Sequence, residues 1–381
     1  MKRVISPITV RILGLSMMVL APAGALLVAA GCSTPQRKLP AQPVAAAPIV
    51  ESHFVGNAAC AGCHKKEYQS HKKSFHALTA HRIADIGPIT VPKGAIPGSK
   101  CFIRHKDGNL YVSVGGSPDG AVTVKYGLGS GKTGITFIAF TSNNTLFEMR
   151  ASYFPRIHQW YRTPGHGNLE ANEIGLDYRT PEAKLCIGCH MTTTPADSLE
   201  PEPRFLGVGC ESCHGPGSAH IDLAKRGERT NLGMEHLGTI GAIKLSNLCG
   251  RCHRTQQDVA QRTPGLINET QRFQSHGMAK SRCFKESNDK LTCLTCHNPH
   301  ANASTDMKRY ETACLSCHGK GPLTTAAASR VVRSKPCPVN PEKGCIPCHM
   351  PARKILPQAQ RSPVAADHFI HIVNSGPRKA N

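Results

Sequence analysis

Large aromatic side chains are scarce in this chain of 381 residues: Phe, Tyr and Trp together make up 5% of it, with a single tryptophan. Acidic residues are scarce too, because 25 Asp and Glu stand against 46 Lys and Arg, which gives a formal net charge of +21. Hydrophobic residues still amount to 40%, which excludes a disordered chain. A folded protein with so few large apolar side chains must fill its interior with something else or hold it together covalently.

Long apolar runs are also lacking, apart from residues 12–30 near the N-terminus. Lys2, Arg3 and Arg11 precede this run, and it ends in small residues before Cys32, which is typical of a signal peptide over residues 1–31. A permanent transmembrane helix is the alternative, although Pro22 interrupts the run. We therefore expect an exported protein.

The Ala-Ala-Gly-Cys sequence that ends at Cys32 resembles a bacterial lipobox. This resemblance implies that Cys32 becomes an acylated first residue and anchors the protein to a membrane. Residues 32–52 are rich in Pro and Ala, without apolar periodicity, as expected for a lipidated tether. The predicted location is the bacterial periplasm, or the outer membrane and cell surface, and the protein is expected to be a lipoprotein.

Cysteine and histidine are abundant, with 18 and 20 residues. Fourteen of the cysteines form seven copies of Cys-x-x-Cys-His, whereas chance would give about 0.04 copies at these residue frequencies. We number these motifs 1 to 7 along the chain. Their cysteines are Cys60 and Cys63, Cys186 and Cys189, Cys210 and Cys213, Cys249 and Cys252, Cys293 and Cys296, Cys314 and Cys317, and Cys345 and Cys348. Their histidines are His64, His190, His214, His253, His297, His318 and His349.

The spacing of the motif fits covalent attachment of c-type haem. Two thiols three positions apart can form thioethers with the two vinyl groups of one haem, and the next histidine then binds the iron. Zinc is the alternative, since paired Cys-x-x-Cys units build zinc ribbons, but zinc does not require a histidine after every pair. The sequence therefore predicts seven covalently attached c-type haems as iron cofactors.

Motifs 2 to 7 lie between residue 186 and the C-terminus, at about 33 residues per haem, which is too little chain for a conventional core. We therefore expect a mainly α, haem-packed multihaem cytochrome with extensive loops and closely packed haems. Residues 53–100 are predicted to form the first haem segment, and residues 166–381 a six-haem cytochrome domain. A helix is expected over residues 65–83, and Met191 and Met350, which directly follow motif histidines, are expected to pack rather than to bind iron.

Residues 101–165 contain no haem motif and form a predicted small β-rich insert in the N-terminal part. Apolar and polar residues alternate over residues 110–114, 121–126, 134–140 and 145–154, with Gly, Pro and Asn turns between these runs. This pattern predicts an antiparallel β-meander or a pair of hairpins. By elimination, the insert is interpreted as a cover for haem edges or a surface for a partner.

Each haem iron needs a second axial ligand, whose identity separates an electron carrier from an enzyme with an open site. Thirteen histidines remain after those of the motifs. The candidate ligands are His76, His220, His300, His368, His166 and His276, and His371 lies near His368 in the chain. An ordinary surface or core histidine is the alternative for each. Ligation by two histidines throughout would give low potentials relative to His/Met ligation.

Several segments resemble the cytochrome c-554 family of multihaem cytochromes, within the larger group that includes hydroxylamine oxidoreductase. The resemblance covers about residues 53–83 and 180–371 and rests on the segments around motifs 1, 3, 5 and 7, together with Asp367-His368-Phe369-Ile370. It implies a distal ligand role for His76 and for His220, and it marks the segment of His368 as one that supplies a distal ligand. This chain departs from the four-haem pattern of the family by having seven motifs.

Three cysteines besides Cys32 lie outside the motifs, namely Cys101, Cys283 and Cys337. The segments Ser99-Lys-Cys101-Phe and Ser281-Arg-Cys283-Phe are alike, and an exported protein permits a disulfide between them. The sequence leaves open whether this disulfide forms. Cys337 would then remain free.

The favoured function is electron transfer between redox protein partners, from a quinol-side donor to a terminal reductase or an external acceptor. The alternative is a multihaem oxidoreductase in which one open haem acts on a small nitrogen or sulfur compound. No motif ends in Lys instead of His, the replacement found in related nitrite reductases, so an enzyme is less favoured. A structural filament or scaffold subunit is a third class. Nucleic acid is not an expected partner, because the propionates of seven haems would offset most of the positive charge.

Overall fold

The structure, a computed structural model, describes residues 51–87, 89–230, 232–263, 265, 267–319, 337–356 and 362–372. These residues belong to the second of two compact units, which spans Val50–Asn381. The predicted signal peptide, the tether and Cys32 lie outside the described residues. No helix in the described ranges is long and apolar enough to cross a membrane.

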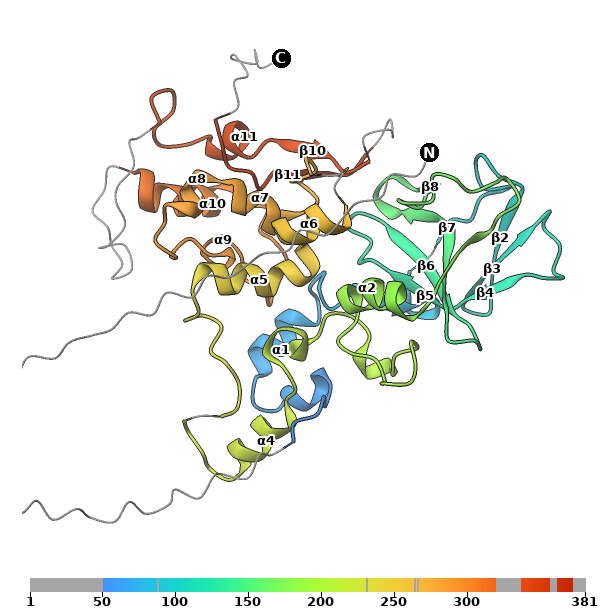
Figure 1. Cartoon of the computed structure of the whole chain (residues 1–381), viewed down its shortest axis with the longest axis horizontal. Helices are drawn as coiled ribbons and strands as arrows, with labels where there is room; N and C mark the ends of the chain where they lie inside the picture. Colours follow the sequence, from blue (N-terminus) through green and yellow to red (C-terminus); the bar gives the residue numbers. More distant parts are fainter. Residues whose placement is uncertain are drawn as a thin grey trace, which may run out of the picture. The chain divides into compact units, whose positions relative to one another are not determined.

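Most of the strands lie between residues 80 and 178 and form two antiparallel sheets (Figure 1). The larger sheet has the order β1 (Ala80–Arg82), β5 (Tyr126–Leu128), β6 (Ile135–Phe140), β7 (Leu146–Phe154) and β8 (Gln159–Arg162), and β9 (Gly175–Tyr178) also pairs with β7. The smaller sheet has the order β2 (Cys101–Lys106), β3 (Asn109–Val114) and β4 (Val122–Val124). A third pair, β10 (Ala352–Lys354) and β11 (Val364–Ala366), lies near the C-terminus.

The strands predicted in residues 101–165 are confirmed, but their grouping differs from a simple meander. The predicted strand over residues 121–126 is divided, because Val122–Val124 pairs in the smaller sheet and Tyr126–Leu128 in the larger one. The larger sheet also recruits β1 and β9, which lie outside the predicted insert. The long strand β7 accounts for β9, since its two halves pair with β8 and β9 on the edge opposite β6, whereas β1 pairs with β5.

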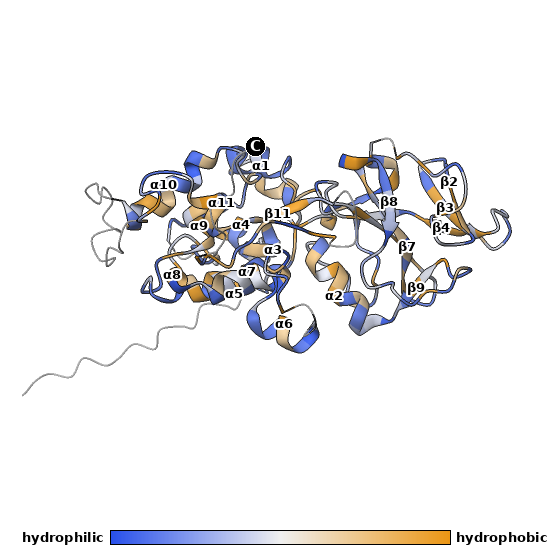
Figure 2. Ribbon diagram, turned by 90° about the horizontal axis from the view of Figure 1, so that it is seen from above, coloured by the Kyte–Doolittle hydropathy of each residue, from blue (hydrophilic) through white to orange (hydrophobic). Residues whose placement is uncertain are grey.

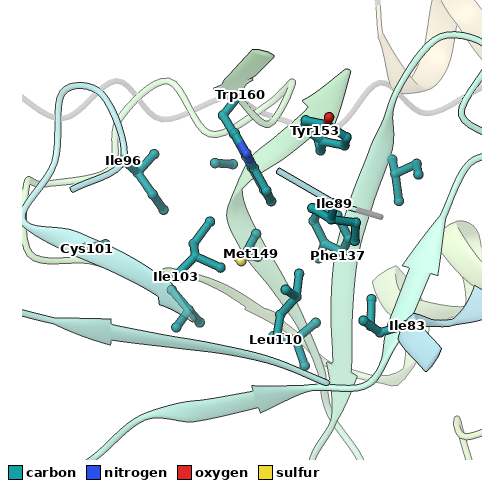
Figure 3. Close-up of a cluster of buried hydrophobic side chains, with 14 of the residues drawn as sticks. Ile83, Ile89, Ile96, Cys101, Ile103, Leu110, Phe137, Met149, Tyr153 and Trp160 are labelled. Atoms are coloured by element: carbon teal, nitrogen blue, oxygen red, sulfur yellow. The ribbon is translucent and has the colours of Figure 1, made fainter. Parts of the chain in front are cut away.

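An apolar core lies between these sheets and is built from their inward-facing side chains (Figure 3). Phe137 and Met149 are fully buried, and the indole of Trp160 packs at 5.3 Å from the ring of Phe137. The indole N–H of Trp160 donates to the carbonyl of Thr90 at 2.7 Å, so this buried polar group is satisfied. In Figure 2 the strands β3, β4 and β7 carry hydrophobic colour beside hydrophilic loops.

A second apolar core joins the larger sheet to the helix of motif 2, α2 (Thr180–His190). Ala183, Ile187 and Met191 pack there against strand residues that include Ile138 and Leu146. Met191 is therefore a packing residue, as predicted. This contact attaches motif 2 to the sheet.

The remaining described chain is mostly helical, with short helices separated by loops (Figure 1). The α-helices after α2 are α3 (Cys210–His214), α4 (Ser218–Lys225), α5 (Ala242–His253), α6 (Gln256–Arg262), α7 (Gln274–Lys280), α8 (Arg282–Lys285), α9 (Cys293–Cys296), α10 (Met307–His318) and α11 (Cys345–His349). Motif 1 lies between the 3-10 helix η1 (Asn57–Cys60) and α1 (Lys65–His71); further 3-10 turns are η2 (Ile83–Asp85), η3 (Pro155–Ile157) and η4 (Pro203–Phe205). The prediction of a mainly α fold with loops and a β-rich part is thus confirmed only in part, because the sheets form a substantial folded body of their own.

The helix predicted over residues 65–83 is wrong beyond His71, where α1 ends. Residues 72–79 form turns, and the side chain of Thr79 donates to the carbonyls of His76 at 2.8 Å and His190 at 3.0 Å. The next residues, Ala80–Arg82, pair with β5. Strand pairing and these local hydrogen bonds override the helical pattern.

We predict that Phe137→Ala lowers the free energy of unfolding of the sheet region by about 3–5 kcal/mol, because it opens a cavity in a fully buried core. Val114→Ala, at a strand position 43% exposed, is the matched control and should change stability by less than about 0.5 kcal/mol. Thermal unfolding followed by circular dichroism measures both. Equal destabilisation by the two substitutions would contradict a core at Phe137.

Candidate functional site

The seven Cys-x-x-Cys-His motifs share one local geometry, because each lies on or beside a short helix. Motifs 3 and 7 are the helices α3 and α11 themselves, motif 5 overlaps α9, and motifs 2, 4 and 6 form the last turns of α2, α5 and α10. Two cysteines three positions apart on a helix lie on the same face. Each motif thus presents two thiols to one side, with the histidine directly after them.

The described histidines form opposed pairs in which one member belongs to a motif. The imidazole centres of His64 and His220 are 6.0 Å apart, and those of His76 and His253 are 6.1 Å apart. The centres of His214 and His300 are separated by 6.3 Å, and those of His297 and His368 by 6.2 Å. Four of the predicted ligand candidates therefore lie opposite the histidines of motifs 1, 4, 3 and 5.

Hydrogen bonds to Nδ1 orient several of these rings. Nδ1 of His253 lies 2.8 Å from the side-chain oxygen of Gln274, and Nδ1 of His220 lies 3.1 Å from the carbonyl of Leu232. In motif 2, Nδ1 of His190 lies 3.1 Å from the carbonyl oxygen of Thr79. An Nδ1–H that donates to a carbonyl fixes the tautomer with a lone pair on Nε2. These rings are therefore prepared to bind a metal through Nε2.

Burial keeps several of these imidazoles neutral. It lowers the pKa of His368 to about 4, and it also lowers the pKa of His76, His190 and His214. The cause is the same in each case, since a protonated imidazole loses its hydration when buried. A neutral imidazole is the form that binds a metal.

The segment around His368 is held from three sides. The carboxylate of Asp367 accepts hydrogen bonds from Thr270 Oγ1 at 2.5 Å and from Arg353 Nε at 2.6 Å. Ser281 Oγ donates to the carbonyl of His368 at 3.2 Å. Gly277 in α7 allows this close approach, because a Cβ there would lie 2.9 Å from the backbone carbon of His368. The position of His368 thus depends on α7 and the C-terminal β-hairpin.

His166 and His276 are engaged differently from the paired histidines. Nε2 of His166 lies 2.9 Å from the carboxylate of Glu148, and Nε2 of His276 lies 2.9 Å from the carbonyl of Ile267. Neither ring lies opposite a motif histidine in the ring contacts of the described chain. The structure therefore argues against both as ligands through Nε2, because that nitrogen is already used.

Two further histidines, His371 and His71, lie near motifs but are not in the four opposed pairs. His371 stacks on Phe369 at 4.1 Å, and its backbone carbonyl lies 3.1 Å from Nδ1 of His349, so it supports motif 7 through its main chain. His71 was missed by the sequence reasoning. It is buried, and burial together with the nearby His76 and His300 lowers its pKa to about 4. Its position two helical turns after His64 was an available signal.

A cavity of about 660 Å³ adjoins motif 3. Cys213 and His214 line it on one side, and residues of α5, including Lys244 and Arg251, line it on the other. The guanidinium of Arg251 donates to the carbonyl of Ser212. The cavity therefore combines two motif side chains, apolar walls and cationic groups.

The disulfide between Cys101 and Cys283 that the sequence left open is absent from the structure, where both cysteines are free. Cys101 is fully buried in β2, where its thiol contacts the carbonyl of Glu173 at 3.4 Å. Cys283 lies in α8, where burial raises the pKa of its thiol. Cys337 is free as well.

The chain matches one protein family and one curated relative in sequence. The family described as cytochrome c554 and c-prime matches residues 157–215, which contain motifs 2 and 3. "Multiheme cytochrome MtrA" of Shewanella baltica (strain OS185) is 25% identical over an alignment of 185 residues, which covers 38% of this chain and 55% of that relative's length. These sequence matches support a multihaem c-type cytochrome.

Two solved structures are also similar. The chain aligns with the outer cell wall cytochrome OcwA over 84% of its length and 80% of that chain, at 16% identity and a TM-score of 0.47. It aligns with an undecahaem cytochrome from the S-layer of Carboxydothermus ferrireducens over 84% of its length and 52% of that chain, at 16% identity and a TM-score of 0.40.

The geometry of the described residues fits haem iron. A metal ion binds an imidazole nitrogen at about 2.0–2.1 Å, so two imidazoles on opposite sides of one ion have ring centres about 6.3 Å apart. The four histidine pairs have separations of 6.0 to 6.3 Å. Each pair therefore leaves room for one iron between its two rings. We give the candidate haem site at each motif the number of that motif, so that site 1 is the site at motif 1.

A buried carboxylate ties site 3 to the chain before site 1. Glu211, inside motif 3, is 3% exposed and accepts hydrogen bonds from the backbone N–H groups of Val55 at 2.9 Å, Gly56 at 2.8 Å and Gly217 at 2.7 Å. Hydrogen bonds to a charged acceptor are about twice as strong as neutral ones. This carboxylate therefore holds two haem sites together without a cationic partner.

We predict that Glu211→Gln lowers the free energy of unfolding by about 1.5–3 kcal/mol, because an amide offers one acceptor oxygen and turns a donor toward backbone donors. Glu202→Gln is the matched control, since Glu202 forms an exposed ion pair with Arg204 at 2.9 Å and should contribute less than about 1 kcal/mol. Thermal melting of the haem-loaded protein measures both. If the Glu211→Gln protein is as stable as the control, Glu211 does not stabilise the contact between motif 3 and the chain before motif 1.

Proposed function

We propose that the protein is an exported, membrane-tethered heptahaem c-type cytochrome that transfers electrons along closely packed haems, most of them ligated by two histidines. The observation that carries this proposal is the set of four imidazole pairs at the spacing of one shared iron. Iron with two histidine ligands has no open position for a substrate, which suits electron transfer rather than catalysis.

The motif residues take their predicted roles in this proposal. The fourteen motif cysteines form the thioethers, and the seven motif histidines are the proximal ligands. The distal ligands are His220 at site 1, His300 at site 3, His76 at site 4 and His368 at site 5. His166 and His276 are left out of the ligand set.

When bound, the haems supply iron that changes between the ferric and ferrous states. The protein's own residues orient the axial imidazoles and keep them neutral, as the burial of His368 and the hydrogen bond from His253 Nδ1 to Gln274 illustrate. The cavity at Cys213 has apolar walls, and Arg251 offers positive charge there, whereas Lys244 is paired with Glu235. Two neutral histidine ligands favour low reduction potentials.

The positive charge of the chain supports the same proposal. Removal of residues 1–31 takes away three basic residues and no acidic ones, which leaves +18. Fourteen propionates from seven haems would reduce this to about +4 if all ionise. The basic residues therefore offset cofactor charge, and a nucleic-acid partner is not part of the proposal.

The proposed location is the periplasm or the outer membrane and cell surface, with a lipid at Cys32. The proposed partners are a quinol-side donor and a terminal reductase or an external acceptor. The signal-peptide and lipobox patterns and the sequence match to a multihaem cytochrome support this part of the proposal.

We expect seven haems in the purified protein, because each motif provides both thiols and a ligand. Intact mass and a pyridine haemochrome measurement on the mature protein count them, with a haem stain after denaturation to show covalent attachment. A count below seven would contradict the central claim.

We expect that His220→Ala, His300→Ala and His368→Ala each convert one haem from low spin to high spin, because each removes one distal ligand. Electron paramagnetic resonance of the oxidised protein measures the high-spin fraction, which should rise to about one haem in seven. His276→Ala and the exposed His105→Ala serve as controls and should leave every haem in its original spin state.

An oxidoreductase is the second candidate, and one cluster would favour it. Glu148 binds His166 and acts electrostatically on both Cys186 and His190 of site 2, and burial together with Glu148 raises the pKa of Tyr178. Such polar groups beside an open haem could move protons to a small substrate. A high-spin fraction in the unmodified protein that binds cyanide or nitrite would support this candidate instead of the carrier.

A further inference from the structure

Contacts between the motifs do not follow their order along the chain. Sites 1 and 3 touch directly, because η1, which ends at Cys60 of motif 1, packs against α3 of motif 3. The side chain of Asn57 also accepts from the backbone N–H of Cys210 at 2.8 Å. Site 3 is therefore the neighbour of site 1, although site 2 lies between them in the sequence.

Sites 2 and 4 form a reciprocal contact. The thiol of Cys189 in motif 2 donates to the carbonyl of Arg251 at 3.6 Å, and the thiol of Cys252 in motif 4 donates to the carbonyl of Gly188 at 3.8 Å. The helices α2 and α5 that carry these motifs pack together. Each motif thus places a haem-attaching thiol against the backbone of the other.

Site 4 also touches sites 3 and 5. Arg251 within motif 4 donates to the carbonyl of Ser212 within motif 3, and α3 and α5 line the same cavity. On the other side, α5 packs against α9, which carries motif 5. Sites 2, 3 and 5 therefore each contact site 4.

The last sites continue in chain order. Helix α10, which carries motif 6, packs against α9 of motif 5 and against α11 of motif 7. The carboxylate of Glu311 in α10 accepts from the backbone N–H of Gly344 at 2.6 Å, directly before motif 7. Sites 5, 6 and 7 thus form a single row.

We infer that the seven haem sites form one row in the order 1, 3, 4, 5, 6, 7, with site 2 joining it as a branch at site 4. This inference rests on the proposed function, because it requires a haem at every motif. Each motif cysteine bonds a vinyl carbon of its own haem, so motifs whose helices pack together bring two haem edges close together. The branch consists of site 2, which lies on α2. The apolar face of α2 packs on the six-stranded sheet, and this packing fixes the position of site 2.

The competing arrangement joins site 2 to site 3. Met191 and Thr192, just after motif 2, contact Leu206, Gly207 and Gly209, just before motif 3. These contacts lie outside both motifs, on the C-terminal side of motif 2, whereas Cys189 within motif 2 contacts the backbone of motif 4. The test must therefore separate a branch at site 4 from one at site 3.

Anomalous diffraction at the iron edge, on crystals of the haem-loaded protein, locates each iron and assigns it to a motif through its thioethers. We expect site 4 to be the nearest iron to site 2, and site 3 the nearest to site 1. Site 2 nearer to site 1 or site 3 would overturn the inference. Fewer than seven irons would instead overturn the proposed function.

A measurement in solution uses a neighbouring haem as a relaxation enhancer. His76→Ala makes site 4 high spin, and His300→Ala makes site 3 high spin. Each is combined with Cys186→Ala/Cys189→Ala, which removes site 2, and intact mass confirms six haems. We expect removal of site 2 to lower the microwave power that half-saturates the high-spin signal of site 4 and to leave that of site 3 unchanged. The reverse pattern would overturn the branch at site 4, and crystals of the unmodified protein decide the matter if a variant does not fold.

Discussion

The opposition of imidazole pairs, each with room for one iron, is the constraint on which the proposed haem sites depend. In each of the four pairs, the two histidines come from segments far apart in the sequence, such as His64 with His220 and His297 with His368. Under the proposed function, coordination would close long loops, and the metal–ligand bonds would offset the entropy that loop closure costs. Helices as short as α3, α9 and α11 are not stable alone in water, so we expect them to form around their cofactors.

The sheet region follows a different principle, because its core consists of ordinary side chains. Phe137, Met149 and Trp160 pack there with aliphatic residues from both sheets. The few aromatic residues of the chain are thus concentrated where no haem motif lies. The scarcity of aromatics elsewhere has the reason that the sequence suggested: cofactors fill the space that side chains would otherwise occupy. One apolar face of the larger sheet joins the two parts by packing on α2.

The motifs, the strands and four of the opposed histidines could be predicted from the sequence, because each depends on local spacing or on a local resemblance. The pairing of β1 and β9 could not, since β1 pairs with the open edge of β5 and β9 with the part of β7 that β8 leaves open. The helix expected through His76 failed because Thr79 bonds to distant carbonyls. His166 and His276 were indistinguishable from ligands in the sequence, and the partners of their Nε2 atoms emerge only in three dimensions.

The proposed order of the haem sites in space differs from their order along the chain because the histidine opposite a motif histidine comes from a segment near another motif. His220 follows motif 3 but lies opposite His64 of motif 1, and His300 follows motif 5 but lies opposite His214 of motif 3. A segment that donates a ligand backwards brings part of its own chain to the site that it serves. Glu211 acts in the same direction, since it binds the backbone ahead of motif 1 from within motif 3. In the proposed arrangement, each of the four sites with an opposed histidine is completed by chain near another motif, so a fragment that keeps a motif can still lose the second ligand of its iron.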